Sequence, residues 1–548
     1  MNFKENESAT KLRGGYYTDL DIAIFLTRWV LGIKPKSILE PSCGDGIFLE
    51  ALSQLDYKSV NSFTALEIEA TEATKSKERA HKLKDIEIEI KIEDFLIWSL
   101  YRFGNHQRFD AVVGNPPFIR YQYMDSVLQG RSQKIFEYHR LHFTKHTNLW
   151  VPFIIASISL LRPGGRLAMV VPAEILHVIH AQSLRKFLTE QCSKVLFFDP
   201  AELLFENILQ GAGLLLAEKK SDLDDKFHGV AIIPTRTRLF LGEDPEAYFL
   251  KSDFVNGKIL TGKWMKALLT KHERDIIDDL SQKPEIFEFY KIASVDVGIV
   301  TGANNFFLVP DETVEKYGLK RWAYPMFGRS SHAPGIIYDK KNHEDNRKSG
   351  LPTNFLWFDS ERVENFPELV KEYIKKGEIE DLPKRYKCRI REPWYAVPSV
   401  YASPVGMLKR CHDFPRLILN EILAFTTDTA YRIKAEKVED SKLVFSFINS
   451  LTALCAELEG RHYGGGVLEM VPSEIEKLLI PLPEIIQYDI KLLDKKIRNG
   501  APVEEIFEAQ NDILLGAVGL KKNSQADLYS AWDRLRLRRQ RGKAKNVS

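Results

Sequence analysis

The chain has 548 residues, of which 44% are hydrophobic and 28% charged, and its formal net charge is +2. That composition is ordinary for a globular protein of two to four domains, and the small net charge gives no bulk evidence for a nucleic-acid partner. No stretch approaches eighteen consecutive apolar residues and the N-terminus is polar, so we expect neither a membrane span nor a signal peptide. The five scattered cysteines show no zinc-ligand spacing, which indicates a reducing cytoplasm and no metal site.

The first predicted helix, residues 21–31, has apolar side chains at helical spacing and follows Gly14-Gly15-Tyr16-Tyr17-Thr18. Thr18 or Asp19 can cap this helix. A helix N-terminus favours an anionic group such as a carboxylate, although a glycine–aromatic segment before a helix is more often an ordinary turn.

A glycine loop, Pro41-Ser42-Cys43-Gly44-Asp45-Gly46, joins a short strand ending at Glu40 to a predicted helix over residues 47–54. The glycines allow a ligand to approach the backbone closely. The loop lacks the third glycine of a dinucleotide fingerprint and the Gly-Lys-Ser/Thr of a phosphate loop, so a pyrophosphate is not its natural ligand. Glu40 and Asp45 add negative charge, which suits a cation such as S-adenosylmethionine with its sulfonium and ammonium groups.

The next two predicted strands also lead into acidic residues. Glu67 follows the strand over residues 62–66 and lies about 20 residues after Gly46, the spacing at which an acidic residue binds ribose hydroxyls in nucleotide-binding βαβ units. The strand over residues 86–92 leads to Asp94 and Phe95, which can bind an adenine amino group and cover its ring. For Asp94 alone, a capped helix start is the favoured interpretation.

The fourth predicted strand, residues 109–113, ends in Gly114-Asn115-Pro116-Pro117-Phe118. Proline has no N–H and a fixed φ, so this loop is stiff, and it lies where open α/β sheets bind ligands. The Asn115 amide oxygen and the Pro116 carbonyl are two fixed acceptors that suit an amino group, and Phe118 offers a flat stacking face. The motif indicates a site for a flat, amine-bearing ring; by itself it equally describes a rigid loop.

Residues 119–146 are rich in basic and aromatic side chains, Arg120 and Tyr121 among them, which fits either a mobile loop over DNA or a solvated excursion. Predicted helices and strands then alternate over residues 150–161, 166–171, 182–190, 195–198 and 211–217. This alternation predicts an α/β, doubly wound, Rossmann-like domain over residues 1–225, bounded by a charged linker at 219–226.

Five segments occur in a fixed order: Gly15-Tyr16-Tyr17-Thr18, Leu39-Glu40-Pro41-Ser42-Cys43-Gly44-Asp45-Gly46, Glu67, Asp94-Phe95 and Asn115-Pro116-Pro117-Phe118. Over residues 14 to about 220 this set resembles the gamma class of DNA amino-methyltransferases, the adenine-N6 modification enzymes of restriction–modification systems. One departure is the acid-rich glycine loop, with Glu40 where the family often has Asp and Asp45 where it often has a small residue. Both changes keep the character of the loop.

The resemblance implies a role for each motif. The methionine end of S-adenosylmethionine would be held by Tyr17-Thr18 and by the loop residues Glu40, Pro41, Gly44 and Gly46. Glu67 would hold the ribose, and Asp94-Phe95 would hold the adenine. Asn115 would lie beside these cofactor residues. Asn115 and the Pro116 carbonyl would grip the target amine, Phe118 would stack on the flipped base, and Phe205, matched by position alone, would flank it.

Residues 226–484 are expected to form an α+β target-recognition domain. Residues 297–307 read as strand, glycine turn and strand, and basic residues such as Arg389 and Arg391 alternate with aromatic ones, which suits a surface that contacts DNA phosphates and bases. An ordinary α+β surface is the alternative. Residues 485–548 are expected to be helical, with a basic tail from Arg534 to Lys545 whose charges repel and fray it; a DNA-binding arm and a solubilising tail are equal interpretations.

The combined prediction is a monomeric, site-specific adenine-N6 methyltransferase acting on duplex DNA in the bacterial cytoplasm, at the nucleoid, and paired with a separate restriction endonuclease. The alternatives are an N-methyltransferase acting on RNA or a protein amide, and a non-catalytic DNA-specificity subunit. A fused nuclease is not expected, since the sequence has no convincing acidic-acidic-Lys constellation. The chemistry of the motif leaves adenine N6 and cytosine N4 both open, and the recognition sequence is not predicted.

Overall fold

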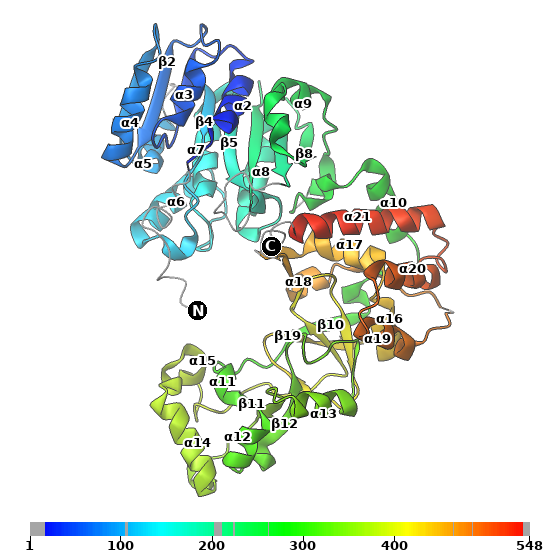
Figure 1. Ribbon diagram of the computed structural model, residues 1–548. Coiled ribbons are helices and arrows are strands. Elements are labelled where there is room, and N and C mark those ends of the chain that lie inside the picture. Colours follow the sequence, from blue (N-terminus) through cyan, green and yellow to red (C-terminus); the bar gives the residue numbers. More distant parts are fainter. Residues whose placement is uncertain are drawn as a thin grey trace. The chain divides into compact units, whose positions relative to one another are not determined.

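The computed structural model describes residues 17–104, 108–201, 211–222, 225–260, 262–463, 465–484 and 486–540. The chain forms two compact units, which divide between Leu269 and Thr270 (Figure 1).

The first unit is built on one eight-stranded sheet in the order β3-β2-β1-β4-β5-β7-β6-β8. Its strands are β1 (Ser37–Glu40), β2 (Ser62–Glu67), β3 (Glu87–Ile92), β4 (Phe109–Gly114), β5 (Leu161–Pro172), β6 (Cys192–Pro200), β7 (Ala212–Lys219) and β8 (Gly229–Thr235). Only β7 runs antiparallel to its neighbours, β5 and β6. The sheet is therefore large and mixed, and the prediction of an α/β unit is confirmed at that level.

Helices cover both faces of this sheet. On one face α2 (Leu20–Leu31), α3 (Ile47–Ser53) and α4 (Ala70–Ala80) pack in series. On the other, α5 (Phe95–Arg102), α6 (Ser126–Tyr138), α7 (Trp150–Leu160) and α8 (Gln182–Gln191) do the same. Because β1 to β4 are parallel, their carboxyl ends and the loops that follow meet at one edge.

The first unit extends beyond the expected end of the domain at residue 225. After the charged segment, β8 pairs in parallel with β6, and α9 (Pro245–Lys251) follows. Phe240 stacks on Phe198 with ring centroids 5.2 Å apart and meets Phe25 edge-on at 5.5 Å. The break in composition at 219–226 therefore falls between two strands of one sheet, β7 and β8.

The second unit is an α+β assembly. Its five-stranded sheet has the order β10 (Ala293–Val297), β19 (Ala430–Ala435), β15 (Val405–Leu408), β17 (Leu417–Asn420) and β13 (Ile337–Tyr338). A four-stranded sheet combines β11 (Leu308–Val309), β14 (Asn354–Leu356), β12 (Ala323–Phe327) and β18 (Phe425–Thr426). Residues 297–307 are not a strand–turn–strand unit, because Asn304–Phe307 forms a short helix, α11, whose Phe306 and Phe307 are buried.

The C-terminal helices belong to this second unit. Besides α10 (Lys271–Ser281), α14 (Glu368–Ile379) and α16 (Asp440–Ser446), its helices include α17 (Ser450–Glu459), α19 (Ile490–Arg498), α20 (Val503–Leu514) and α21 (Lys522–Gln540). The last of these packs on α17, α20 and α10. In the described residues no single helix is long and apolar enough to cross a bilayer; the bent pair α16–α17 passes by length and composition, and α17 is buried.

The expectation that the basic tail frays is wrong up to Gln540. Arg539 is fully buried and binds both carboxylate oxygens of Glu457, with Nη2 2.6 Å from Oε1. Arg534 pairs with Glu273 at 2.7 Å, and Arg536 pairs with Asp413 at 3.0 Å as well as with the neighbouring Asp533 at 2.6 Å. The basic residues of the tail would repel one another if the tail were considered alone, but carboxylates that are mostly distant in sequence neutralise them.

Candidate active site

A cavity of about 480 Å³ lies at the carboxyl edge of the first sheet. Most of the residues predicted to bind the cofactor line it together: Tyr17, Thr18, Glu40, Pro41, Gly44, Glu67, Asp94, Phe95 and Asn115. They come from four strand ends and the start of α2, segments that the parallel sheet brings to one edge.

The glycine loop needs both of its glycines for backbone reasons. Gly44 and Gly46 have φ of +51° and +86°, in the left-handed region that favours glycine. A Cβ on Gly46 would also lie 2.9 Å from the Cα of Ser76 in α4. Gly46 does not line the cavity, so its role is the close packing of α3 against α4, whereas Gly44 faces the cavity.

Glu67 holds the glycine loop in place. Its Oε2 accepts the Gly44 N–H at 2.9 Å, and its Oε1 accepts the Glu69 N–H at the same distance. The carboxylate therefore joins the end of β2 to the loop after β1 while it lines the cavity.

Glu40 is an acidic residue in the wall of the cavity. Its side chain is fully buried, and neither carboxyl oxygen has a hydrogen-bond partner among the described residues. Burial, together with the nearby charges of Glu67 and Asp45, raises the pKa of Glu40 well above its ordinary value. Asp45 is already paired with Arg79 at 2.7 Å, whereas Glu40 has no paired cation among the described residues. A positively charged group in the cavity would supply it.

Both carboxylate oxygens of Asp94 have partners within the fold. Its Oδ1 caps α5 by accepting the Ile97 N–H at 2.9 Å, as the helix-cap interpretation predicts, and its Oδ2 pairs with Arg131 of α6 at 2.9 Å. Phe95 is buried, with its ring 5.1 Å from that of Phe153. Both residues also line the cavity.

The Asn115 loop is fixed on two sides. Asn115 donates through Nδ2 to Thr18 Oγ1 at 3.1 Å, and its main-chain carbonyl accepts the Ser42 hydroxyl at 2.9 Å. The donor end of the amide is thereby used inside the site, and the acceptor end is the one suited to an amine. Pro117 lines the cavity, Pro116 is buried, and Phe118 packs partly buried against the core of the unit.

Two residues that the motifs do not reveal hold the continuation of this loop. Asn148 accepts the Tyr121 N–H at 3.0 Å through Oδ1 and donates through Nδ2 to Glu174 at 2.8 Å. Glu174 is buried and also accepts the Trp150 Nε1–H at 3.0 Å. No local pattern predicts this contact, because Glu174 lies on the segment after β5.

The residues predicted to contact DNA differ in their exposure and in their contacts within the fold. Arg120 is exposed, and Tyr121 lies edge-on to His146 with ring centroids 4.8 Å apart. The mobile loop or solvated excursion expected over 119–146 instead contains α6, which Asp125 caps by accepting the Leu128 N–H.

In the second unit, Arg389 is exposed beside the Tyr386 ring. Arg391 is committed to the fold, since its Nη1 and Nη2 donate to the Thr301 and Val300 carbonyls at 2.7 and 2.6 Å. The geometry therefore does not support Arg391 as a DNA contact. Phe205 lies outside the described residues, and the described part of the chain contains no group of His, Cys, Asp and Glu that could hold a metal ion.

Two family models match this chain. The Eco57I restriction-modification methylase model matches residues 25–203, and the model of the C-terminal domain of the type II methyltransferase M.Eco57I matches residues 261–515. The type II methyltransferase M.AccI of Acinetobacter calcoaceticus is 23% identical over 499 residues, which cover 88% of this chain and 86% of that protein. M.HincII of Haemophilus influenzae is 27% identical over 201 residues, 36% of each protein. Among solved structures, the type IIG restriction endonuclease BpuSI matches with a TM-score of 0.45 and 15% identity, over 97% of this chain and 67% of that one.

Proposed function

Because this chain belongs to the Eco57I family of type II restriction–modification DNA methyltransferases, we propose that it methylates adenine at N6 in duplex DNA. The observation that carries the proposal is the Asn115-Pro116-Pro117-Phe118 loop at the end of β4, beside the cavity that gathers the predicted cofactor residues. We also propose that the enzyme works as a monomer on nucleoid DNA in the cytoplasm, and that it protects that DNA from a separate endonuclease.

The residues of the cavity fit S-adenosylmethionine. Glu40 is a buried carboxylate with no paired cation among the described residues, and the ammonium and sulfonium of this cofactor are cations. Glu67 and the Asp94–Phe95 pair stand at the two following strand ends, where they would hold the ribose and the adenine. When bound, the cofactor supplies an electrophilic methyl group on sulfur.

The Asn115 loop would act on the target base. An exocyclic amine inside the duplex stack is out of reach, so the base must be flipped out. The Asn115 side-chain oxygen and the Pro116 carbonyl would each accept one amine hydrogen, which orients the nitrogen and increases its electron density. Neither an amide nor a carbonyl takes up a proton at neutral pH, so the loop contributes position and electrostatics and no general base.

The second unit would read the DNA sequence. All predicted cofactor residues that the structure describes lie before Leu269, and exposed basic–aromatic pairs such as Arg389 with Tyr386 occur after it. This division of labour is the proposed organisation of the chain.

Two measurements test the proposal. Nucleosides from the genome of a methylation-free host expressing this chain should contain N6-methyladenine at one recurring site; N4-methylcytosine there would transfer the proposal to cytosine. Asn115→Ala should lower the methylation rate roughly 100-fold or more, the scale of one lost electrostatic contact to the reacting group, and leave cofactor affinity within several-fold.

Asn61→Ala is the matched control, since Asn61 is exposed at the opposite end of β2 and should keep full activity. Loss of cofactor binding together with an unfolded Asn115→Ala protein would make Asn115 a structural residue.

A further inference from the structure

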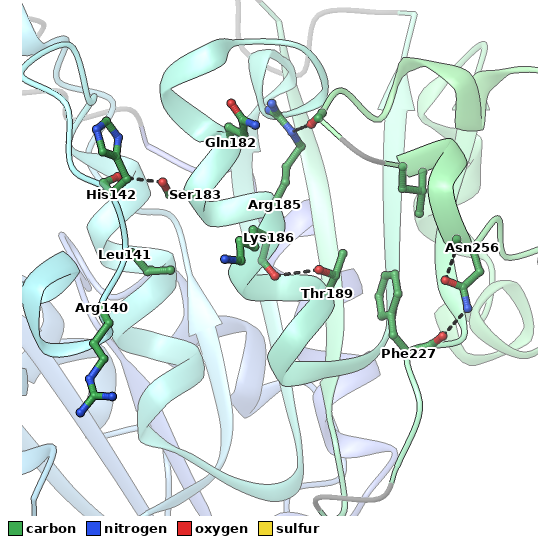
Figure 2. Close-up of a pocket in the computed structure, with 13 residues that line it drawn as sticks. Arg140, Leu141, His142, Gln182, Ser183, Arg185, Lys186, Thr189, Phe227 and Asn256 are labelled. Carbon is green, nitrogen blue, oxygen red and sulfur yellow. Dashed lines mark hydrogen bonds between the residues drawn. The ribbon is translucent and has the colours of Figure 1, made fainter.

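A second cavity, of about 690 Å³, lies along α8 of the first unit and holds none of the residues discussed as cofactor or target-base contacts (Figure 2). The loop from Arg140 to His142 lies on one side of α8, and the segments of Phe227 and Asn256 lie on the other. Four lining side chains are basic, Arg140, His142, Arg185 and Lys186, and none of the lining residues is acidic. A concave surface with this lining favours an anion.

Arg185 places a buried positive charge in the wall of this cavity. Its side chain donates to main-chain carbonyls alone among the described residues: Nε to Gly262, and Nη1 to Ile175 at 2.8 Å and to Val178 at 2.9 Å. No described carboxylate pairs with it, and burial lowers the pKa of Arg185 to about 9. The guanidinium still carries its charge at pH 7, and no carboxylate of the described residues balances it.

Arg140 occupies a position that usually belongs to glycine. It follows His139, the C-cap of α6, and has φ of +53°. Its N–H donates to the Glu137 carbonyl at 3.0 Å, and the Leu141 N–H donates to the Phe136 carbonyl at 2.9 Å. This is the hydrogen-bond pattern of a Schellman cap, whose left-handed residue is most often Gly. An arginine there strains the backbone, and its side chain lines the cavity.

The cavity begins at the same edge of the sheet as the Asn115 loop. Because β4 and β5 are parallel, they end together, and the chain passes from β5 into the start of α8. The Ser183 hydroxyl in the first turn of α8 donates to the His142 carbonyl at 2.7 Å, which fixes the basic loop to that end of the helix. No side-chain hydrogen bond caps α8, although the Gln182 N–H donates to the Ile179 carbonyl of the preceding turn, and the positive end of the helix dipole adds to the positive potential.

We propose that this cavity binds a backbone phosphate of the DNA substrate, away from the bases that are read. The inference rests on the proposed function, since it takes DNA as the substrate. Arg140 and Lys186 would contact the phosphate from the rim, with Arg185 as the fixed charge behind them. Lys186 pairs with Glu190 at 3.7 Å, but both side chains are exposed, and such a pair is weak enough to exchange for a phosphate.

The test is the salt dependence of DNA binding by the full-length Arg140→Gly/Lys186→Gln variant. Glycine relieves the strain at residue 140 and Lys186 is exposed, so the variant should unfold at the same temperature as the wild type or higher. The slope of log Kd against log salt for a duplex carrying the methylation site should fall by about two, roughly one for each lost phosphate contact. Cofactor affinity should not change.

Lys77→Gln is the matched control, because Lys77 is exposed on α4 and its loss removes one charge outside the cavity. It should leave the slope unchanged. A wild-type slope in the double variant, with normal methylation by the wild type, would overturn the inference and leave the proposed function standing; a wild-type protein that neither binds nor methylates duplex DNA would overturn the function itself. Titration with pyrophosphate is the last arm: binding that the double variant loses, with the DNA slope unchanged, would assign the cavity to a free anion and overturn the DNA contact.

Discussion

Glu40 in the first unit and Glu457 in the second are both fully buried carboxylates, yet their surroundings are opposite. Glu457 is gripped by Arg539 and lies 3.3 Å from His462 Nε2, whereas Glu40 has no partner among the described residues. Burial alone would raise the pKa of both. Hydrogen bonds with His462 and Arg539 hold the pKa of Glu457 below its ordinary value, while that of Glu40 stays well above it.

The difference shows how a buried charge can be interpreted. A carboxylate whose cation is built into the fold stabilises one arrangement of the chain, here the docking of α21 on α17. A carboxylate that is buried in a cavity wall without its cation destabilises the empty protein and favours a cationic ligand. The first kind supports structure, and the second points to a binding site.

The largest expected effect is the loss of folding and cofactor binding when the first unit, which contains Glu40, is shortened. A fragment of residues 1–269 keeps the whole eight-stranded sheet, whereas a fragment of residues 1–220 loses β8 and Phe240, Leu241 and Phe249 of the core. We expect the longer fragment to unfold cooperatively and bind S-adenosylmethionine in calorimetry, and the shorter one to do neither. A shorter fragment that binds the cofactor with full affinity would return the boundary to the charged loop.

Breaking the paired charge should destabilise the second unit. Arg539→Met removes the cation of Glu457 and leaves a buried carboxylate facing His462, which should lower the free energy of unfolding by about 3–5 kcal/mol in a denaturant titration. The control is Lys371→Met, which breaks an exposed pair with Glu368 and should cost less than about 1 kcal/mol. Equal effects of the two changes would remove the distinction between built-in and surface charges.

Neutralising Glu40 should not destabilise the protein, in contrast to the loss of Arg539. Glu40→Gln removes a carboxylate that no described residue balances, so the protein without cofactor should melt at an equal or higher temperature. Its affinity for S-adenosylmethionine should fall by about 1.5–3 kcal/mol, the contribution of a hydrogen bond to a charged group. A variant that melts lower and binds normally would place Glu40 among the structural charges.

The smallest effect is a pH dependence of the same group. Because the pKa of Glu40 is raised in the folded protein, its contribution to stability is complete below the ordinary value of 4.5 and is lost as pH rises through the raised pKa. A bound cation prefers the carboxylate, so cofactor affinity should rise with pH over that window and proton release should accompany binding. Calorimetry in buffers of different ionisation enthalpy measures both, and Glu40→Gln should abolish the dependence.

Local patterns predicted the elements that carry the site. The strands ending at Glu40, Glu67 and Gly114 lie within a residue or two of their predicted positions, because short apolar runs ended by glycine, proline or an acidic residue have few other conformations. Helix α6 was missed although the Asp125-Ser126 start is a cap signal, since the basic and aromatic content of the segment suggested a loop.

The sequence by itself determined the order of the motifs and their position after strands, and a parallel sheet then brings them to one edge whatever the rest of the chain does. Only the tertiary structure decided which charges have partners. Arg539 and Glu457 are 82 residues apart, and Arg391 finds the Val300 and Thr301 carbonyls 91 and 90 residues away. Such pairings depend on how elements pack and not on local conformation. A basic tail and a basic–aromatic cluster therefore contain arginines that are bonded within the fold, while Glu40, ordinary in the sequence, has no partner among the described residues.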